Sequence, residues 1–170
     1  MFLDEFSINR AMTRSRARSP RGTRAVVTEP TRTGVNISVV SALSIAGVIA
    51  PMTLEGSVDA EAFNNYVEHF LVPALYPKDI VIMDNVPFHL SERAKALIAS
   101  SNAEVIFLPA YSPDLNPIEE CISKIKALLR KAKARTKRKL LKALKWAMDQ
   151  VSQLDVVGWF IHAGYLCTSN

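Results

Sequence analysis

The chain has 170 residues, 49% of them hydrophobic and 22% charged, which is the ordinary composition of one globular domain with a buried core. Its net charge is +5, and its two cysteines have no CxxC or Cys/His spacing, which argues against a zinc site or a disulfide framework. The longest apolar stretch, 37–54, contains Ser, Gly and Pro and is too interrupted for a membrane span, and no secretory signal begins the chain. We therefore expect a single cytoplasmic domain covering residues 1–170.

Strands dominate the first third of the chain. Residues 2–6 are expected to form a short strand, and residues 14–30, rich in Arg, Ser, Pro and Gly, an extended arm. Two strands rich in Val and Ile follow at 35–45 and 48–54, with a turn at Ala46-Gly47 between them.

Helices and strands alternate in the rest of the chain. The first is a helix that Asp59 caps, and its apolar residues are Phe63, Val67, Phe70 and Leu71. A strand at 80–83, a helix at 91–100, a strand at 104–108 and a loop at 111–117 follow. The last two are a helix with apolar Ile118, Ile122, Ile125 and Leu129 and a helix at 137–151. This order predicts an α/β fold, a mixed sheet of about five strands with helices on its faces. Trp146 and Trp159 are expected in the core.

Two acidic positions belong to predicted strands. Asp84 directly follows a buried strand, and in such sheets reacting groups collect at the carboxyl ends of the strands. Alternation along the first strand sends Asp4 and Glu5 to opposite faces, so only one of them can share a pocket with Asp84, and we favour Asp4. The alternative is that these acids cap strand ends or face solvent.

Glu119 has two interpretations. Asn116 is a good N-cap, Pro117 suits the first helical position, and Glu119 stands where a capping-box acid bonds back to the backbone. Against a purely structural acid, a proline-stiffened loop fixes the start of this helix, and Lys126 and Arg130 share roughly the same helix face. A carboxylate beside cations can hold a metal near a phosphate backbone.

Basic residues are concentrated in an arm, about 10–32, and in C-terminal helices, about 117–151. Eleven Lys or Arg and no acid lie between Lys124 and Lys145, and seven Arg lie between Arg10 and Arg32. Such blocks usually bind phosphate, although a solvated helix face gives the same pattern. The candidate nucleic-acid contacts are Arg14, Arg21, Lys124, Lys126 and Arg130.

Three stretches together resemble one protein family. They are Leu3-Asp4-Glu5, Met83-Asp84-Asn85 with His89, and Leu108-Pro109-Ala110-Tyr111-Ser112-Pro113-Asp114-Leu115-Asn116-Pro117-Ile118-Glu119. They resemble the catalytic domain of mariner-type transposases and their bacterial insertion-sequence relatives. The 34 residues between Asp84 and Glu119 match the spacing that this resemblance expects, and the likeness runs from Phe2 to about Tyr165.

The resemblance implies a ribonuclease-H-like fold and DNA transposition. Asp4, Asp84 and Glu119 would then be the catalytic residues and the ligands of two Mg²⁺ ions, for which Mn²⁺ can substitute. Family members hydrolyse a phosphodiester at the element end, and the freed 3′ hydroxyl attacks target DNA; they work as dimers. Asn85 and His89 would be accessory residues that orient a metal-bound water or a phosphate, and the alternative for His89 is a hydrogen bond within a turn or the core.

The resemblance also raises an expectation about a partner. The family carries a helix-turn-helix region before the catalytic half, whereas this chain begins three residues ahead of Asp4. Either another reading frame supplies the recognition half, or the chain is a silent truncated copy that binds only DNA or a full-length transposase. A different nuclease on the same fold is the third possibility.

Overall fold

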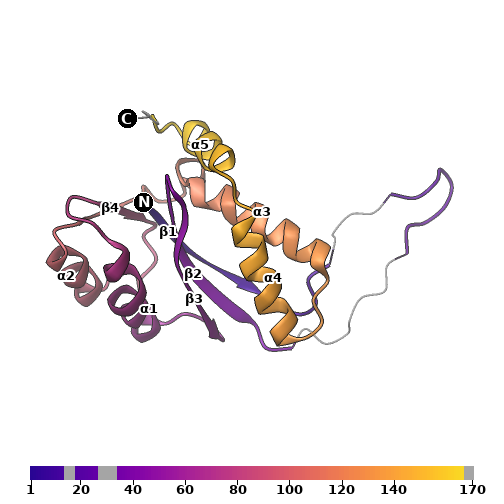
Figure 1. Cartoon of the computed structure of the whole chain (residues 1–170), viewed down its shortest axis with the longest axis horizontal. Coiled ribbons are helices and arrows are strands. Elements are labelled where there is room, and N and C mark those ends of the chain that lie inside the picture. Colours follow the sequence, from indigo (N-terminus) through magenta and orange to yellow (C-terminus); the bar gives the residue numbers. More distant parts are fainter. Residues whose placement is uncertain (14–17, 27–33, 167–170) are drawn as a thin grey trace.

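The centre of the protein is a five-stranded sheet with the strand order β3-β2-β1-β4-β5 (Figure 1). The strands are β1 (Phe2–Ile8), β2 (Ile37–Ser44), β3 (Gly47–Glu55), β4 (Ile80–Met83) and β5 (Glu104–Phe107). β1, β2 and β3 pair antiparallel, whereas β4 pairs parallel with both β1 and β5. The predicted α/β fold with a mixed sheet of five strands is therefore confirmed. The computed structural model describes residues 1–13, 18–26 and 34–166.

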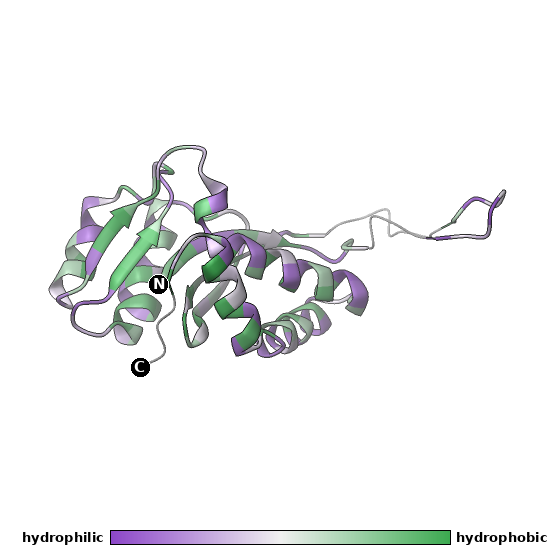
Figure 2. Cartoon of the chain, turned by 90° about the horizontal axis from the view of Figure 1, so that it is seen from above, coloured by the Kyte–Doolittle hydropathy of each residue, from purple (hydrophilic) through white to green (hydrophobic). Residues whose placement is uncertain are grey.

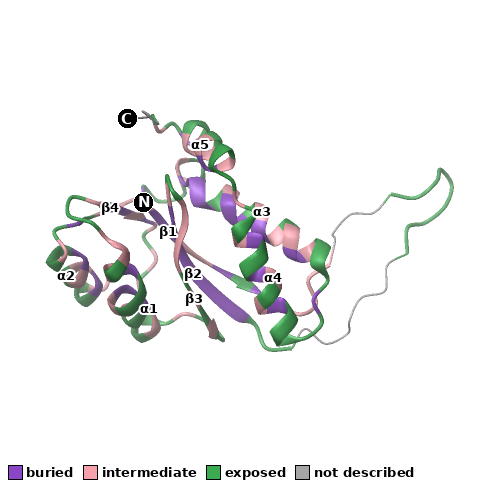
Figure 3. Ribbon diagram, in the orientation of Figure 1, coloured by how far each residue is buried: buried purple, intermediate pink, exposed green. Residues whose placement is uncertain are grey.

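β2 is the most deeply buried strand because strands flank it on both edges and helices cover both of its faces (Figure 3). Val39 and Leu43 point to one face, and Val40 and Ala42 point to the other. The continuous apolar run from Ile37 is thus that of a strand covered on two sides rather than an alternating surface strand.

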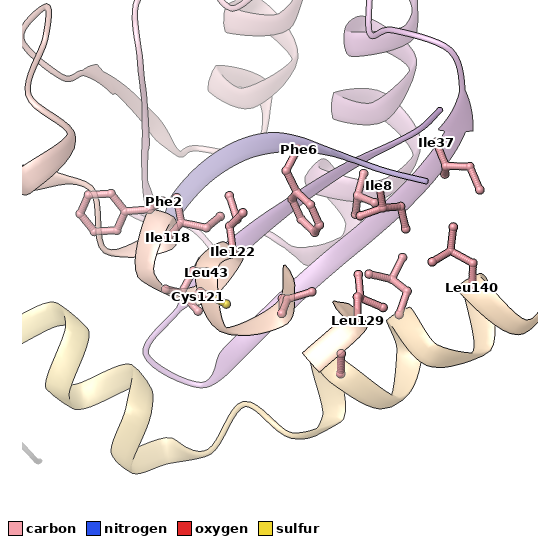
Figure 4. Packing of buried hydrophobic residues seen from close by; sticks show 14 of the residues in the cluster. Phe2, Phe6, Ile8, Ile37, Leu43, Ile118, Cys121, Ile122, Leu129 and Leu140 are labelled. Carbon is pink, nitrogen blue, oxygen red and sulfur yellow. The ribbon is translucent and has the colours of Figure 1, made fainter. Parts of the chain in front are cut away.

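One face of the sheet is covered by α3 (Pro117–Ala132), α4 (Lys137–Asp149) and α5 (Gln153–His162) (Figure 1). The predicted apolar stripe of α3 is buried against β1 and β2 (Figure 4). Cys121 is also buried there, and burial raises the pKa of its thiol to about 12, while Cys167 lies outside the described residues.

Helix α5 was not expected from the sequence, although its start carries a signal. Ser152 and Asp155 form a capping box, in which Ser152 accepts from the backbone of Asp155 and Asp155 accepts from the backbone of Ser152. This Ser-x-x-Asp pattern is visible in the sequence and could have placed the helix.

The other face is covered by α1 (Ala60–Tyr66), the π-helical turn Val67–Leu71, a 3₁₀ turn at Val72–Ala74, and α2 (Glu92–Ser100). Asp59 caps α1, as predicted. Phe70, which was expected on the apolar stripe, is instead 42% exposed. The π-helical turn has more residues per turn than an α-helix, so it shifts the side chains that follow out of the 3.6-residue phase.

Two further expectations concern the tryptophans, and one of them was wrong. Trp146 is 45% exposed because α4 turns Leu144 and Ala147 inward, and position 146 lies on the outer side of the same helix. Trp159 is partly buried against the core, as predicted.

In Figure 2 hydrophobic and hydrophilic residues alternate around the helices, which is the pattern of helices packed on one side only.

The arm was predicted to be extended over 14–30. Residues 18–26 contain neither helix nor strand, are exposed, and project away from the sheet (Figure 1), while residues 14–17 and 27–30 lie outside the described part. In the described ranges, the protein has no helix that combines the length and apolar character needed to cross a bilayer.

β3 forms one edge of the sheet and is irregular in its middle. Its register against β2 shifts between Val40 and Ala42, where Ala50 and Pro51 of β3 lie opposite one residue of β2, and within this bulge Ala50 has a φ of 48°. Pro51 follows directly and is exposed. A proline is tolerated here because an edge strand or bulge leaves some backbone N–H groups without a ladder partner.

The core offers a direct stability test in α3. Leu129 is 1% exposed, and Leu129→Ala is expected to lower the free energy of unfolding by about 2–5 kcal/mol, because the lost apolar contacts leave a cavity. Urea denaturation measures this change. The control is Leu154→Ala, whose side chain is 86% exposed and whose effect should stay within about 0.5 kcal/mol. Equal losses in the two variants would contradict the packing described above.

Candidate functional site

Two neighbouring parallel strands bring Asp4 and Asp84 together. Phe2 of β1 is aligned with Ile82 of β4, so continuing both strands by two residues sets Asp4 beside Asp84. Asp84 directly follows the last residue of β4, at its carboxyl end. Asp4 lies within β1, where the backbone N–H of Glu5 donates to its Oδ1 at 2.7 Å.

The start of α3 is tied to β1 rather than closed by a side-chain cap. Asn116 is the N-cap residue of α3, but its side chain makes no capping bond. Its Nδ2 instead donates to Oδ2 of Asp4 at 3.2 Å, across 112 residues of sequence. The capping-box interpretation of this segment therefore does not describe Asn116, and the bond holds the first turn of α3, with Glu119, beside the two strand acids.

A single cavity of about 490 Å³ collects the three candidate acids. Asp4 enters it from β1, Asp84 from the end of β4, and Glu119 from the first turn of α3. The rest of the lining comes from the segments after β4 and β5, namely Asn85, Val86, Pro87, Leu108, Pro109, Ala110, Tyr111, Ser112, Pro113 and Asn116. Asn85 donates from Nδ2 to the carbonyl of Leu108 at 2.7 Å, which joins these two segments.

The neighbours of the three acids point elsewhere. Oε1 of Glu120 lies 3.3 Å from Nδ1 of His162 in α5. Glu5 follows Asp4 in β1 and so alternates to the other face of the strand, where its Oε2 lies 3.4 Å from Nε2 of His89. Neither residue lines the cavity. The expectation that alternation would separate Asp4 from Glu5 matches this arrangement.

The negative charges of neighbouring carboxylates act on Asp4 in the cavity. The pKa of Asp4 is raised to about 7, first because burial penalises its charged form and then because the charges of Glu5, Glu119 and Asp84 oppose it. The hydrogen bond from the backbone of Glu5 acts in the opposite direction. Such a group of like charges is the environment that a divalent cation stabilises.

The oxygen atoms of the cavity are of the type that a hard divalent cation binds. Mg²⁺ and Mn²⁺ prefer oxygen ligands, and the cavity offers three carboxylates. Oδ1 of Asn116 is buried and has no hydrogen-bond partner in the described part of the chain, which adds an unsatisfied oxygen beside Asp4. Within residues 1–13, 18–26 and 34–166, however, no three His, Cys, Asp or Glu side chains are close enough to form a complete ligand group.

His89 is buried next to the acids. Its Nδ1 lies 2.6 Å from Oδ1 of Asp84, and its Nε2 lies 3.4 Å from Oε2 of Glu5, an ion-pair distance without hydrogen-bond geometry. Burial by itself lowers the pKa of His89, but the contacts with Glu5 and Asp84 outweigh it, so the pKa is raised. The ring does not line the cavity, so it contacts Asp84 rather than the space where a phosphate would lie.

The predicted nucleic-acid contacts are in different environments. Lys124 forms a salt bridge with Asp155 and joins α3 to α5, and Nζ of Lys126 lies 5.7 Å from the centre of the Phe6 ring. Arg130 is half-buried, Arg21 is exposed on the arm, and Arg14 lies outside the described residues.

Several exposed basic residues belong to the same run but were not singled out. They lie on the last turn of α3, on the turn that follows it and on α4: Lys131, Lys133, Arg135, Lys137, Arg138, Lys139, Lys142 and Lys145. Counting helical phase within the run, with the apolar positions turned inward, could have identified the α4 members. Arg135 donates to the carbonyl of Arg10 at 2.8 Å, which joins this basic turn to the base of the arm.

The capping box of α5 gives a second stability prediction. The pKa of Asp155 is lowered to about 2 by its hydrogen bonds with Lys124 and Ser152, so its stabilising contribution is present above its ordinary pKa near 4 and is lost as the pH falls towards 2. Asp155→Ala should cost about 1 kcal/mol near neutral pH, and the difference from wild type should shrink in acid. Thermal unfolding as a function of pH tests this. Asp149→Ala, which loses only a 3.9 Å contact with Lys145, is the control.

The fold and the cavity together define a class of protein. An open mixed sheet in the order β3-β2-β1-β4-β5, with helices on both faces, is a ribonuclease-H-like fold. The sequence model of the DDE superfamily endonucleases matches residues 1–141, so the chain belongs to that family. No curated protein sequence is similar enough to count as a match.

Solved structures of the Mos1 transposase share this fold. The Mos1 strand transfer complex aligns with a TM-score of 0.72 at 20% identity, covering 94% of this chain and 50% of the Mos1 chain. The mariner Mos1 paired-end complex with Mg gives 0.72 at 22% identity, covering 95% and 51%. The Mos1 mariner transposase catalytic domain gives 0.62 at 16% identity, covering 94% and 74%. The chain thus spans about half the length of the Mos1 chains in the first two complexes.

Proposed function

We propose that this chain, as one domain from 1 to 170, is the catalytic domain of a mariner-like or insertion-sequence transposase that cuts and joins DNA. The observation that carries this proposal is that Asp4, Asp84 and Glu119, from three distant segments, line one cavity. Membership of the DDE superfamily endonucleases supports it. The Mos1 structures of similar fold include strand transfer and paired-end complexes, which also supports DNA as the substrate.

In this proposal, Asp4, Asp84 and Glu119 hold two divalent cations, Mg²⁺ or Mn²⁺, and Mos1 paired-end complexes with each metal support the choice. Two bound cations supply activation of a water or a 3′ hydroxyl and stabilisation of the leaving oxygen in an in-line phosphoryl displacement. Asn116 and the backbone of Glu5 orient the Asp4 carboxylate. Asn85 fixes the segment after β4 against the segment after β5 through the Leu108 carbonyl.

The DNA backbone is proposed to contact the exposed basic residues of α4 and of the turn before it, together with Arg21 on the arm. Lys126 and Arg130 remain candidate DNA contacts, whereas the charge of Lys124 is paired in a salt bridge with Asp155. The proposal also includes a helix-turn-helix partner that recognises the element ends and assembly as a homodimer. We propose that the protein acts in the cytoplasm.

A silent DNA-binding remnant is the second candidate function. It is favoured by one observation, that the described residues contain no three acidic, His or Cys side chains already grouped closely enough for a metal. This candidate predicts DNA binding that weakens steeply with salt, is equal in wild type and Asp84→Asn, and is accompanied by no cleavage.

The decisive experiment is nicking of supercoiled plasmid by the full chain in Mg²⁺ or Mn²⁺. The proposed function expects open-circular product that increases with metal and is abolished by EDTA. Plasmids with and without terminal inverted repeats distinguish a transposase from a general nuclease. DNA binding without nicking at any metal concentration would support the silent remnant and contradict the proposed chemistry.

A further inference from the structure

A buried histidine connects one candidate catalytic acid to a second carboxylate that lies outside the cavity. His89 is 1% exposed and lies between Asp84 and Glu5, with Nδ1 at 2.6 Å from Asp84 Oδ1 and Nε2 at 3.4 Å from Glu5 Oε2. Glu5 comes from β1 and Asp84 from the end of β4, so the imidazole bridges the two strands whose acids enter the cavity.

Two aromatic neighbours and a backbone hydrogen bond hold the ring in place. Its ring centre is 4.6 Å from that of Phe63 in α1 and 4.6 Å from that of Phe88. The backbone N–H of His89 donates to the carbonyl of Val86 at 3.0 Å, which closes a turn directly after Asp84. A ring held in this way has little freedom to move away from Asp84.

The atoms next to Nδ1 show that this nitrogen carries a hydrogen. Nδ1 faces two acceptors of the same residue, the carbonyl oxygen of Asp84 at 3.3 Å and its Oδ1 at 2.6 Å. Because both are acceptors, Nδ1 must be the donor whatever the charge of the ring. The backbone of Val86 also approaches Oδ1, at 3.5 Å, so these contacts engage one oxygen of the carboxylate and leave Oδ2 for a ligand in the cavity.

We propose that His89 is a positioning residue that orients the Asp84 carboxylate for metal binding, with Glu5 holding the far side of the ring. The inference rests on the proposed function, because it assigns a role to a residue behind the same site. Groups that hydrogen-bond to a metal ligand fix its orientation, and their removal typically costs 10–100-fold in metal affinity or activity. A histidine that only fills the aromatic cluster would have no such effect on the metal.

Two substitutions of His89 separate positioning from packing. In His89→Asn the amide nitrogen can take the place of Nδ1, whereas in His89→Gln it takes the place of Nε2 and cannot donate to Asp84. Mn²⁺ affinity, measured by calorimetry on the full chain without DNA, should fall by about 10–100-fold in His89→Gln and be largely retained in His89→Asn. His69→Gln, at an exposed position of the π-helical turn, is the matched control and should bind like wild type.

The outcomes are distinguishable. Equal losses in the Asn and Gln variants, or no loss in either, would overturn the positioning role, whereas no Mn²⁺ binding by wild type would contradict the proposed function itself. If either variant fails to fold, ¹H–¹⁵N NMR of the wild-type imidazole decides. A proton on Nδ1 whose resonance shifts on addition of Mg²⁺ supports the proposal, and a proton on Nε2 alone, or no shift, overturns it.

Discussion

Asp84→Asn is expected to reduce metal-dependent DNA nicking by a factor on the order of 10²–10³, because it removes a proposed charged metal ligand from the cavity that Asp4, Asp84 and Glu119 line. The substitution suits the site, since an Asn oxygen can still accept the hydrogen bond from His89 and the side chain keeps its volume. The Asp84 side chain is 45% exposed, so we expect the melting temperature to change little.

The comparison requires folded protein and intact DNA binding. Circular dichroism and a gel-shift titration at fixed salt should give the same results for Asp84→Asn and wild type. Nicking that persists at the wild-type rate in Asp84→Asn, with a contaminating nuclease excluded by a mock purification, would remove Asp84 from the catalytic set.

Glu119→Gln should produce a loss of nicking of comparable size, and Glu120→Gln should not. Both acids lie in the first turn of α3, where a negative charge is stabilised by the helix dipole by about 0.3–1 kcal/mol, so both substitutions cost the helix about the same. They differ in direction, since Glu119 lines the cavity and Glu120 lies beside His162 of α5. Comparing the two variants therefore separates the loss of a cavity carboxylate from the loss of a charge at the start of α3.

Initial nicking rates in saturating Mg²⁺ measure the difference. If the two variants lost activity equally, the effect would belong to the stability of α3 rather than to a ligand. If Glu120→Gln alone lost activity, the assignment of the third acid would have to move by one residue.

Much of this fold could be predicted because its signals are local. The strands β2 and β4 are Val- and Ile-rich runs, and the apolar stripe of α3 repeats with helical spacing. Trp146 was misplaced because a large apolar residue on an amphipathic helix was assumed to face inward, when its phase relative to Leu144 and Ala147 turns it outward. Phe70 was misplaced because no sequence signal revealed the π-helical turn.

The site depends on contacts that sequence patterns do not encode. Asn116 looks like an ordinary N-cap, and only the tertiary fold brings Asp4 close enough to take its side-chain donor. His89 could be matched to a motif, but its two carboxylate contacts come from separate strands and required the packing of β1 beside β4. Asp4 and Asp84 could be favoured beforehand because strand ends and strand alternation constrain them, whereas Glu119, at a helix start, was chosen with the help of the family resemblance.

The bulge in β3 has a consequence for how copies of the protein can assemble. At Pro51 the outer border of the sheet presents no amide hydrogen, and the left-handed backbone at Ala50 bends the strand away from a straight line. A neighbouring molecule would find no regular row of partners along this border, so a continuous intermolecular sheet is disfavoured there. Any contact between two copies along this border would then have to rely on side-chain surfaces, which works against open-ended polymerisation through β3.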